Sequence, residues 1–327
     1  MLRTLLLCVA LGFSPLGQAA YSSLYVFGDS LLDNGNFYAL SEGAYPPSPP
    51  YAERFTDGPT AAEYLADRLG IALAPSVEGG TNFAVGGATT STLNLGYELE
   101  IPPGLPPALE FTGMQSQVAG FLASPPAFDP AASLFLVWGG SNDLSLAFAQ
   151  GRDPVDAASA AITNLIGMVG ALVGAGATDL LVPDLPHLAH TPFARTLLTE
   201  EQRADLSMLT IAANQTLASA LEQIRDSQPA GLRLMGFDTN AFWDHVIASP
   251  EHFGFSDATT PCLSALEAGT VSNCDSYVFF DDRHPTAAFH QLLGDRFFGR
   301  VPEPSTVALL AIALISALGV RRAMQAR

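Results

Sequence analysis

Four short apolar runs along the chain have the pattern of strands that are buried on both faces. Such strands are almost continuously hydrophobic, whereas apolar and polar residues alternate in a half-exposed strand. The runs cover residues 24–27, 134–138, 180–182 and 232–236. We expect them to form the central sheet of the protein.

Helical patterns lie between these runs. In each of them apolar residues recur at spacings of three and four, which places them on one face of a helix. The predicted helices are 155–174, ended by Gly174; 200–226; and 57–70, which starts at Asp57 and Pro59 and ends at Gly70. The alternation predicts an α/β protein, a three-layer α/β/α sandwich with a mainly parallel central sheet of flavodoxin-like type. Ligands bind such sheets at the carboxyl ends of the strands.

Three stretches follow neither pattern, namely 41–50, 102–107 and 253–276. The first two are rich in proline. Long loops in compact domains often act as lids or pocket walls, although solvated surface loops have the same composition. Both interpretations stay open for these stretches.

The first twenty residues have the layout of a secretory signal peptide. Arg3 precedes an apolar run over 5–13, and the small residues Ala19 and Ala20 end the segment. A basic start, an apolar middle and a small-residue end define such a leader. We predict a signal peptide over 1–20, with a buried first helix as the alternative.

The last residues also form a segment of their own. A Val-Pro-Glu-Pro sequence at 301–304 is followed by an apolar run over 306–320 and then by Arg321 and Arg322. At about 1.5 Å per residue this run spans a membrane core about 30 Å thick only with flanking residues and local thinning. It resembles the PEP-CTERM sorting tail of exported proteins, which implies removal by an exosortase. We predict a sorting tail with a short transmembrane segment over 301–327; a permanent anchor is the alternative.

Between these ends lies a body of residues 21–300, which is long enough for one large domain. The ends predict export through the inner membrane to the cell envelope or the extracellular space, with transient anchoring by the tail. The chain has 32 acidic and 14 basic residues, a net charge of −18 and no lysine. The absence of lysine excludes Schiff-base, phosphate-loop and Ser–Lys chemistry. The acidic balance argues against nucleic acid as a partner.

Cys262 and Cys274 are the two cysteines of the body. In an exported protein a disulfide between them is expected, and two free thiols are the alternative. No histidine cluster accompanies them, so they do not form a zinc framework. His187, His190 and Asp184 are the best candidates for a metal site, but loop or pocket roles suit them better because other ligands are rare. We therefore predict neither a metal nor a cofactor.

Two stretches far apart in the chain carry residues suited to nucleophilic catalysis. The first predicted strand runs into Gly-Asp-Ser-Leu at 28–31, which places Ser30 where an exposed nucleophile belongs. A serine in this position is more often a helix cap. Near the other end, His284 follows Asp281 by three positions. A histidine can accept a hydroxyl proton near neutral pH, and a carboxylate can orient its second nitrogen; a surface histidine is the alternative.

Two glycine-rich turns offer hydrogen-bond donors. One is Thr-Asn-Phe-Ala-Val-Gly-Gly-Ala at 81–88, where glycines let backbone N–H groups approach a substrate. The other is Gly-Gly-Ser-Asn-Asp at 139–143, which presents the Asn142 amide at a strand end. Acyl transfer needs donors that point at the developing negative charge. Either turn alone is also typical of a helix start.

Together the four stretches resemble the motif blocks of the SGNH/GDSL hydrolases, in family order and over nearly the whole body. The resemblance implies an SGNH hydrolase-like fold. It also implies that Ser30 is the nucleophile, His284 the general base and Asp281 the carboxylate that orients it. The oxyanion donors would be the Ser30 N–H, the Gly87 N–H and the Asn142 side chain.

Several neighbouring residues leave alternatives open. Gly86 competes with its neighbour for the second oxyanion donor, and Asp282 competes with Asp281, which the spacing to the histidine favours. Arg283 departs from the small or apolar residue that the family often has there. Its cation would lower the pKa of the adjacent histidine or contact an anionic substrate. His290 is expected to be a residue of the following helix rather than a second base.

The sequence therefore predicts an exported serine esterase or lipase that hydrolyses small-molecule or lipid carboxylic esters through an acyl-enzyme on Ser30. Apolar loops and 20 phenylalanines suit an acyl chain. The sorting tail is associated, by resemblance, with polysaccharide export, so a glycan O-deacetylase or an acyltransferase of the same fold is one alternative. A non-catalytic envelope or matrix binding protein is another, although it would not need the complete set of four side chains.

Overall fold

A parallel sheet of four strands forms the centre of the protein in the part of the chain that the structure describes. The computed structural model describes residues 21–227 and 231–302, so the predicted signal peptide and nearly all of the predicted tail lie outside it. The strand order is β1-β2-β3-β4. The strands are β1 (Ser23–Gly28), β2 (Ser133–Trp138), β3 (Asp179–Pro183) and β4 (Arg233–Phe237). All four were predicted from the sequence to within one residue at each end.

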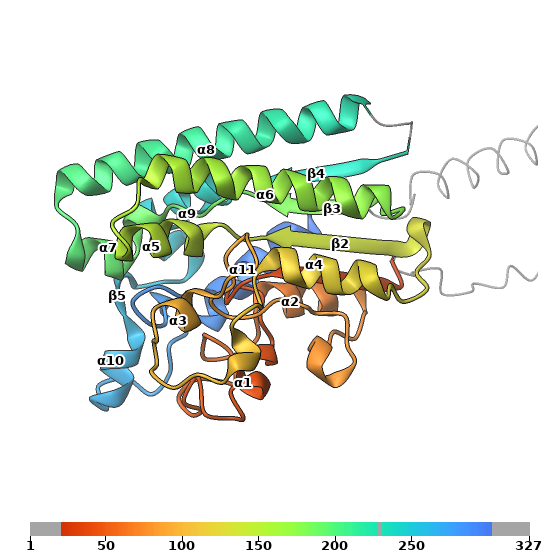
Figure 1. Ribbon diagram of the computed structural model, residues 1–327. Coiled ribbons are helices and arrows are strands. Elements are labelled where there is room, and N and C mark those ends of the chain that lie inside the picture. The colour runs from red at the N-terminus through yellow and green to blue at the C-terminus, as the bar shows by residue number, and fades with distance from the viewer. Residues whose placement is uncertain (1–20, 228–230, 303–327) are drawn as a thin grey trace, which may run out of the picture. The chain divides into compact units, whose positions relative to one another are not determined.

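Helices cover both faces of this sheet. Figure 1 shows α6 and α8 on one side and α2 and α11 on the other. The helices are α1 (Asn36–Leu40), α2 (Ala61–Leu69), α3 (Leu95–Glu98), α4 (Met114–Ala123), α5 (Ser141–Ala149), α6 (Pro154–Gly174), α7 (Pro192–Leu197), α8 (Glu200–Ser227), α9 (Thr239–Ala248), α10 (Cys262–Glu267) and α11 (Ala287–Phe298).

The strand side chains alternate between the two helical layers. Tyr25 and Phe27 of β1 pack in one core cluster with buried residues of α4, α6 and α8. On the opposite face, Trp138 of β2 packs edge-on against Phe297 of α11, with ring centroids 5.5 Å apart. Because β2 and β3 are buried along their whole length, they lack a polar face. The predicted three-layer α/β/α sandwich is therefore confirmed.

The long helices follow the predicted spacing with two differences. The helix α6 ends at Gly174 as predicted, but its first apolar residue, Val155, is 60% exposed and lies outside the buried stripe. By length and composition α6 is also apolar enough to span a membrane. In this fold, however, its buried face packs in the core against β2 and β3, as expected of a core helix.

The helix α2 begins later than predicted, at Ala61 instead of near Asp57. Thr60 caps it, and the Glu63 carboxylate accepts the Thr60 N–H at 2.9 Å, which completes a capping box. Asp57 instead accepts the Ala287 N–H at 2.7 Å and so joins this segment to the start of α11. Gly70 ends α2 with a φ of 69°, as its position predicted.

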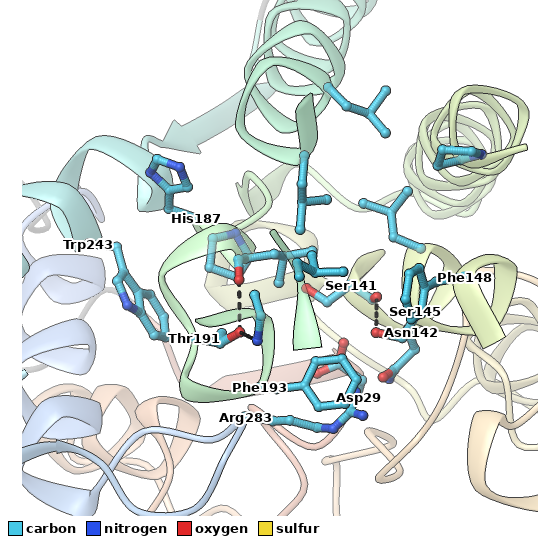
Figure 2. A pocket seen from close by; sticks show the side chains of 18 of the residues that line it. Asp29, Ser141, Asn142, Ser145, Phe148, His187, Thr191, Phe193, Trp243 and Arg283 are labelled. Carbon is cyan, nitrogen blue, oxygen red and sulfur yellow. Dashed lines mark hydrogen bonds between the residues drawn. The ribbon is translucent and has the colours of Figure 1, made fainter. Parts of the chain in front are cut away.

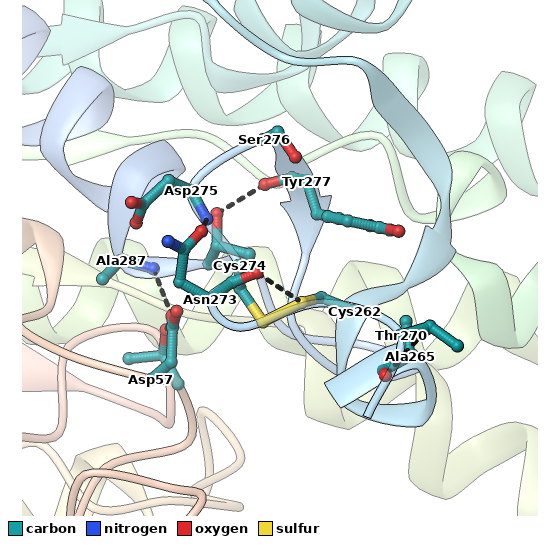
Figure 3. The surroundings of a disulfide bond; sticks show 12 residues. Asp57, Cys262, Ala265, Thr270, Asn273, Cys274, Asp275, Ser276, Tyr277 and Ala287 are labelled. Atoms are coloured by element: carbon teal, nitrogen blue, oxygen red, sulfur yellow. Dashed lines mark hydrogen bonds between the residues drawn. A yellow bond between two sulfur atoms is a disulfide. The ribbon is translucent and has the colours of Figure 1, made fainter. Parts of the chain in front are cut away.

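The missing periodicity of the stretch 253–276 indicated one long loop, but the structure shows regular elements there. The stretch contains β5 (Asp257–Pro261), which pairs with β6 (Tyr277–Phe279), and α10. A disulfide joins Cys262 to Cys274, as expected for an exported chain, and Figure 3 shows it beside the start of β6. These elements are too short to produce a recognisable periodicity in the sequence. Because such short elements bury little apolar surface, the disulfide contributes to their stability.

Candidate active site

The carboxyl edge of the sheet brings two of the motif blocks together. Ser30 follows the end of β1, and Asn142 lies in the first turn of α5, directly after β2. Gly28 and Trp138 are register partners, so the two strands end at the same level. Neighbouring strands of a parallel sheet therefore deliver the hydroxyl and the amide to one site.

The glycine-rich stretch 81–88 reaches the same place along the free edge of β1. Val26 donates its N–H to Thr81 and accepts the Phe83 N–H, at 3.0 and 2.7 Å. The Val85 N–H then bonds the Gly28 carbonyl at 3.2 Å. This pairing resembles that of a short extra strand, and it brings the two glycines that follow Val85 to the carboxyl end of β1.

The two ends of the body meet at His284. Its Nε2 lies 2.8 Å from the Ser30 hydroxyl oxygen, across 254 positions of sequence. Its Nδ1 lies 2.8 Å from Oδ2 of Asp281. The other oxygen of Asp281 accepts the N–H groups of Arg283 and His284 at 2.8 and 2.7 Å. Asp282 points elsewhere, with its carboxylate 3.9 Å from the Arg283 guanidinium, so Asp281 is the carboxylate that contacts the imidazole.

Burial and charge act in opposite directions on this pair. Burial is the largest single influence on His284 and disfavours its imidazolium form. The charge and hydrogen bond of Asp281 and the charge of Asp282 together outweigh burial and raise the pKa of His284 above its ordinary value. Burial likewise acts to raise the pKa of Asp281, but the charge of His284 and the hydrogen bonds it receives lower it overall. The Arg283 cation acts to lower the pKa of His284 but is outweighed. Its guanidinium stacks 3.5 Å above the Phe193 ring.

Gly86 and Gly87, the two candidates for the second oxyanion donor, differ in their hydrogen bonds. The Gly86 N–H is donated to the buried Asp33 carboxylate at 2.7 Å, and burial raises the pKa of Asp33 to about 6. A side chain at Gly86 would also collide with the Phe55 ring, because its Cβ would lie 2.1 Å from the ring. Gly87 adopts a φ of 75°, which favours glycine, and its N–H bonds no group in the described part of the chain.

Asn142 is held by a backbone carbonyl. Its side-chain amide donates one hydrogen to Ala88 O at 2.9 Å, which leaves the second hydrogen for another acceptor. The next residue, Asp143, accepts the N–H and hydroxyl of Thr90 at 2.9 and 2.6 Å. These bonds fasten the start of α5 to the glycine-rich stretch, so both sets of donors keep a fixed spacing.

Tyr51 is a residue of the site that the sequence did not indicate. Its hydroxyl donates to Oδ2 of Asp281 at 2.9 Å, and its ring packs edge-on against Phe280. Tyr51 directly follows the proline-rich loop 41–50, which carries no motif. Its proximity to Asp281 depends on how that loop folds, and no local pattern encodes this contact.

A cavity of about 400 Å³ opens beside Ser30 and His284. Its lining is mostly apolar and comes mainly from the elements that follow β2 and β3, together with Leu31 after β1 and Trp243 of α9. Figure 2 shows Asn142 and Phe148 on one side of this pocket and His187 and Trp243 on the other. Apolar lining residues include Leu144, Phe148, Val155, Leu188, Leu206 and Leu209. Such a pocket accommodates an apolar group attached to the reacting atom at Ser30.

The remaining candidates of the sequence lie away from the Ser30 hydroxyl. His290 is buried in α11, where its Nδ1 accepts the Ala61 N–H at 3.2 Å and burial lowers its pKa to about 3. Asp184 does not join His187 and His190. It accepts the Thr239 N–H at 2.7 Å at the start of α9, and burial raises its pKa to about 7.

A parallel sheet with a serine, a histidine and a carboxylate in line at its carboxyl edge is the arrangement of a hydrolase that uses a serine nucleophile. The sequence profile of the GDSL-like lipase/acylhydrolase family matches residues 24–297. The chain belongs to this family. The profile of the PEP-CTERM protein-sorting motif matches residues 300–323 and indicates export and sorting to the cell envelope or beyond.

Curated relatives agree with this assignment. The chain is 26% identical to Lipase 1 of Photorhabdus luminescens, over 93% of this chain and 54% of that protein. It is 31% identical to an uncharacterized Pseudomonas putida protein, over 95% of this chain and 54% of the relative. It is 26% identical to a phosphatidylcholine-sterol acyltransferase of Aeromonas hydrophila, over 85% and 89% of the two chains. The chain thus spans about half the length of the first two relatives.

Proposed function

We propose that the protein is an exported serine esterase or lipase that hydrolyses carboxylic esters through an acyl-enzyme on Ser30. The observation that carries the proposal is the continuous chain of contacts from the Ser30 hydroxyl through His284 to Asp281. The proposal includes a signal peptide over 1–20, a catalytic domain over 21–300 and a sorting tail over 301–327 that an exosortase processes. The sorting-motif match supports export.

In the acylation step, the Ser30 oxygen attacks the ester carbonyl carbon while its proton passes to Nε2 of His284. The negative charge that forms on the carbonyl oxygen is stabilised by the N–H groups of Ser30 and Gly87 and the free amide hydrogen of Asn142. Asp281 stabilises the imidazolium that has formed. The intermediate then expels the alcohol, which takes the proton from His284, and the acyl group stays on Ser30.

Deacylation repeats these steps with water. His284 takes a proton from the water, whose oxygen attacks the acyl carbon, and the same donors stabilise the second oxyanion. Collapse releases the carboxylic acid and returns the proton to Ser30. An alcohol in place of the water would give acyl transfer, the activity named for the Aeromonas relative.

The pocket beside Ser30 supports an apolar acyl group as the substrate moiety. Leu144 and Phe148 of α5 and Leu206 and Leu209 of α8 line it together. Each methylene of an acyl chain that leaves water for such a pocket contributes about 0.8 kcal/mol. We therefore expect kcat/KM to rise with chain length from acetyl upward until the cavity is filled.

The test is hydrolysis of p-nitrophenyl esters of graded chain length by the full chain and by Ser30→Ala. The wild type should prefer chains longer than acetyl, and Ser30→Ala should lose at least about 10³-fold in kcat. Ser145→Ala is the matched control, because this serine also lines the pocket but bonds only the Ser141 carbonyl within it. Equal turnover by wild type and Ser30→Ala would exclude the acyl-enzyme. A preference for acetylated glycans over all simple esters would favour the deacetylase alternative.

A further inference from the structure

A second cluster of chemically active side chains lies on the far wall of the pocket. His187 precedes the short 3-10 helix η4 (Leu188–His190) and His190 is its last residue. Both histidines contact one carboxylate oxygen of Asp244 in α9. Nδ1 of His187 touches this oxygen directly, and Nε2 of His190 lies 3.0 Å from it. From the sequence, Asp184 was the expected partner of these histidines; the actual partner, Asp244, lies on α9, whose approach to η4 has no signal in the local pattern.

The three ligand atoms of this cluster, which we call the His-His-Asp cluster, converge on one point. All of them lie within 4.8 Å of one another. Ligand atoms around a tetrahedral Zn²⁺ lie about 3.3–3.6 Å apart when the bonds are about 2.0–2.2 Å long. Small side-chain rotations therefore suffice to place an ion between them. Two imidazoles and a carboxylate are a ligand set that suits Zn²⁺ and related divalent transition ions.

Ser207 of α8 supports His187 from behind. Its hydroxyl oxygen touches Nε2 of His187, the nitrogen that does not face Asp244. A hydroxyl can donate a hydrogen bond to this nitrogen or accept one from it. It therefore satisfies the imidazole in both tautomers, including the one with a lone pair on Nδ1 that a metal requires. Such an outer partner is typical of histidines that bind metals.

The cluster is buried on one side and open on the other. The His187 side chain is 9% exposed, whereas those of His190 and Asp244 are 29% and 43% exposed. An ion can therefore enter from solvent and keep a water molecule as its fourth ligand. The two elements that it would join both line the pocket, through Leu188 on one side and Trp243 on the other.

From this geometry we propose that the His-His-Asp cluster binds one divalent transition cation of the Zn²⁺ type, which fastens the η4 turn to α9. The cation serves to hold this wall of the pocket in place. It takes no part in the chemistry at Ser30, so the inference stands independently of the proposed function.

The experiment uses the full chain without a histidine tag, stripped with a chelator and titrated with ZnCl₂. Calorimetry should show one Zn²⁺ bound per chain, and the unfolding temperature should rise with added Zn²⁺. Asp244→Asn and His190→Gln should each weaken binding by at least about tenfold and remove the thermal shift. Both residues are partly exposed, so these variants should retain the wild-type circular dichroism spectrum.

His245→Gln is the matched control, because this histidine lies on the same helix but is not one of the three residues of the His-His-Asp cluster. Its ring stacks against that of His252, with 6.4 Å between the ring centroids. The variant should bind Zn²⁺ as the wild type does. Two results would overturn the proposal: a wild type that binds no Zn²⁺, or Asp244→Asn and His190→Gln variants that both bind it with unchanged affinity.

Discussion

His284 lies between charges of opposite sign on its immediate neighbours in the chain. Asp281 is in direct contact with the imidazole, whereas Asp282 and Arg283 act on it from partly exposed positions. Both carboxylates act to raise the pKa of His284 and the guanidinium acts to lower it, with a net increase. A base must be neutral to accept the Ser30 proton, so this balance determines the pH at which activity begins.

Because the pKa of His284 is raised, kcat/KM for a neutral ester should rise with pH through a midpoint above the ordinary value of 6.5. Asp282→Asn removes a negative charge and should move this midpoint to lower pH. Arg283→Gln removes a positive charge and should move it to higher pH. The measurement is the pH dependence of kcat/KM for the three proteins at low ionic strength. Midpoints that move in the same direction for both variants would contradict this account.

Some residues of the site were readable from the sequence and others were not. Ser30 and Asn142 directly follow buried strands, so their position depends only on where each strand ends. The choice between Gly86 and its neighbour required the structure, because it depends on which N–H bonds Asp33. Tyr51 also required the structure, because its contact with Asp281 spans 230 positions and has no signal in the local sequence.

At the scale of elements, β1, β2 and β3 were predictable because burial on both faces leaves an unbroken apolar run. The run that forms β4 was also found, but the expected burial on both faces is wrong for this strand: it lies at the edge of the sheet, with Arg233 and Gly236 exposed. The helix boundaries were less predictable. The start of α2 is set by a capping box of Thr60 and Glu63, whereas Asp57 accepts a hydrogen bond from the first residue of α11. The largest difference between prediction and structure is in the segment 253–276, where no regular element was predicted. Its helix and strand are too short for periodicity to reveal, and the disulfide fixes them.

The disulfide supports the segment that carries Asp281. Cys262 and Cys274 are buried against Phe280, and Leu263 donates its N–H to the Phe280 carbonyl at 2.8 Å. Replacing both cysteines by alanine should lower the free energy of unfolding by about 3 kcal/mol, because the bond closes a short loop in the unfolded chain. Chemical unfolding of wild type and variant measures this difference.

Reduction of the wild-type disulfide should reproduce the loss, and the double variant should then respond to reductant no further. Equal stabilities of wild type and double variant would show that packing around Phe280 holds this segment without the covalent bond.

For the whole molecule, the decisive feature is that residues from both ends of the body complete one site. The sheet brings Ser30 and Asn142 to its carboxyl edge, and α11 packs beside α2 so that the turn before it delivers His284. The residues of the site were predicted from sequence motifs that resemble those of a known family. Their meeting in space depends on the packing of the outer helical layer, which no local pattern specifies.

Covalent labelling tests this meeting most directly. A fluorophosphonate reacts with a serine oxygen only when a neighbouring base removes its proton. The full chain should take up one phosphonyl group, which mass spectrometry of its peptides should locate on Ser30, and His284→Gln should label at least about 10³ times more slowly. Folded wild-type protein that stays unlabelled, or a His284→Gln variant that labels at the wild-type rate, would contradict the account.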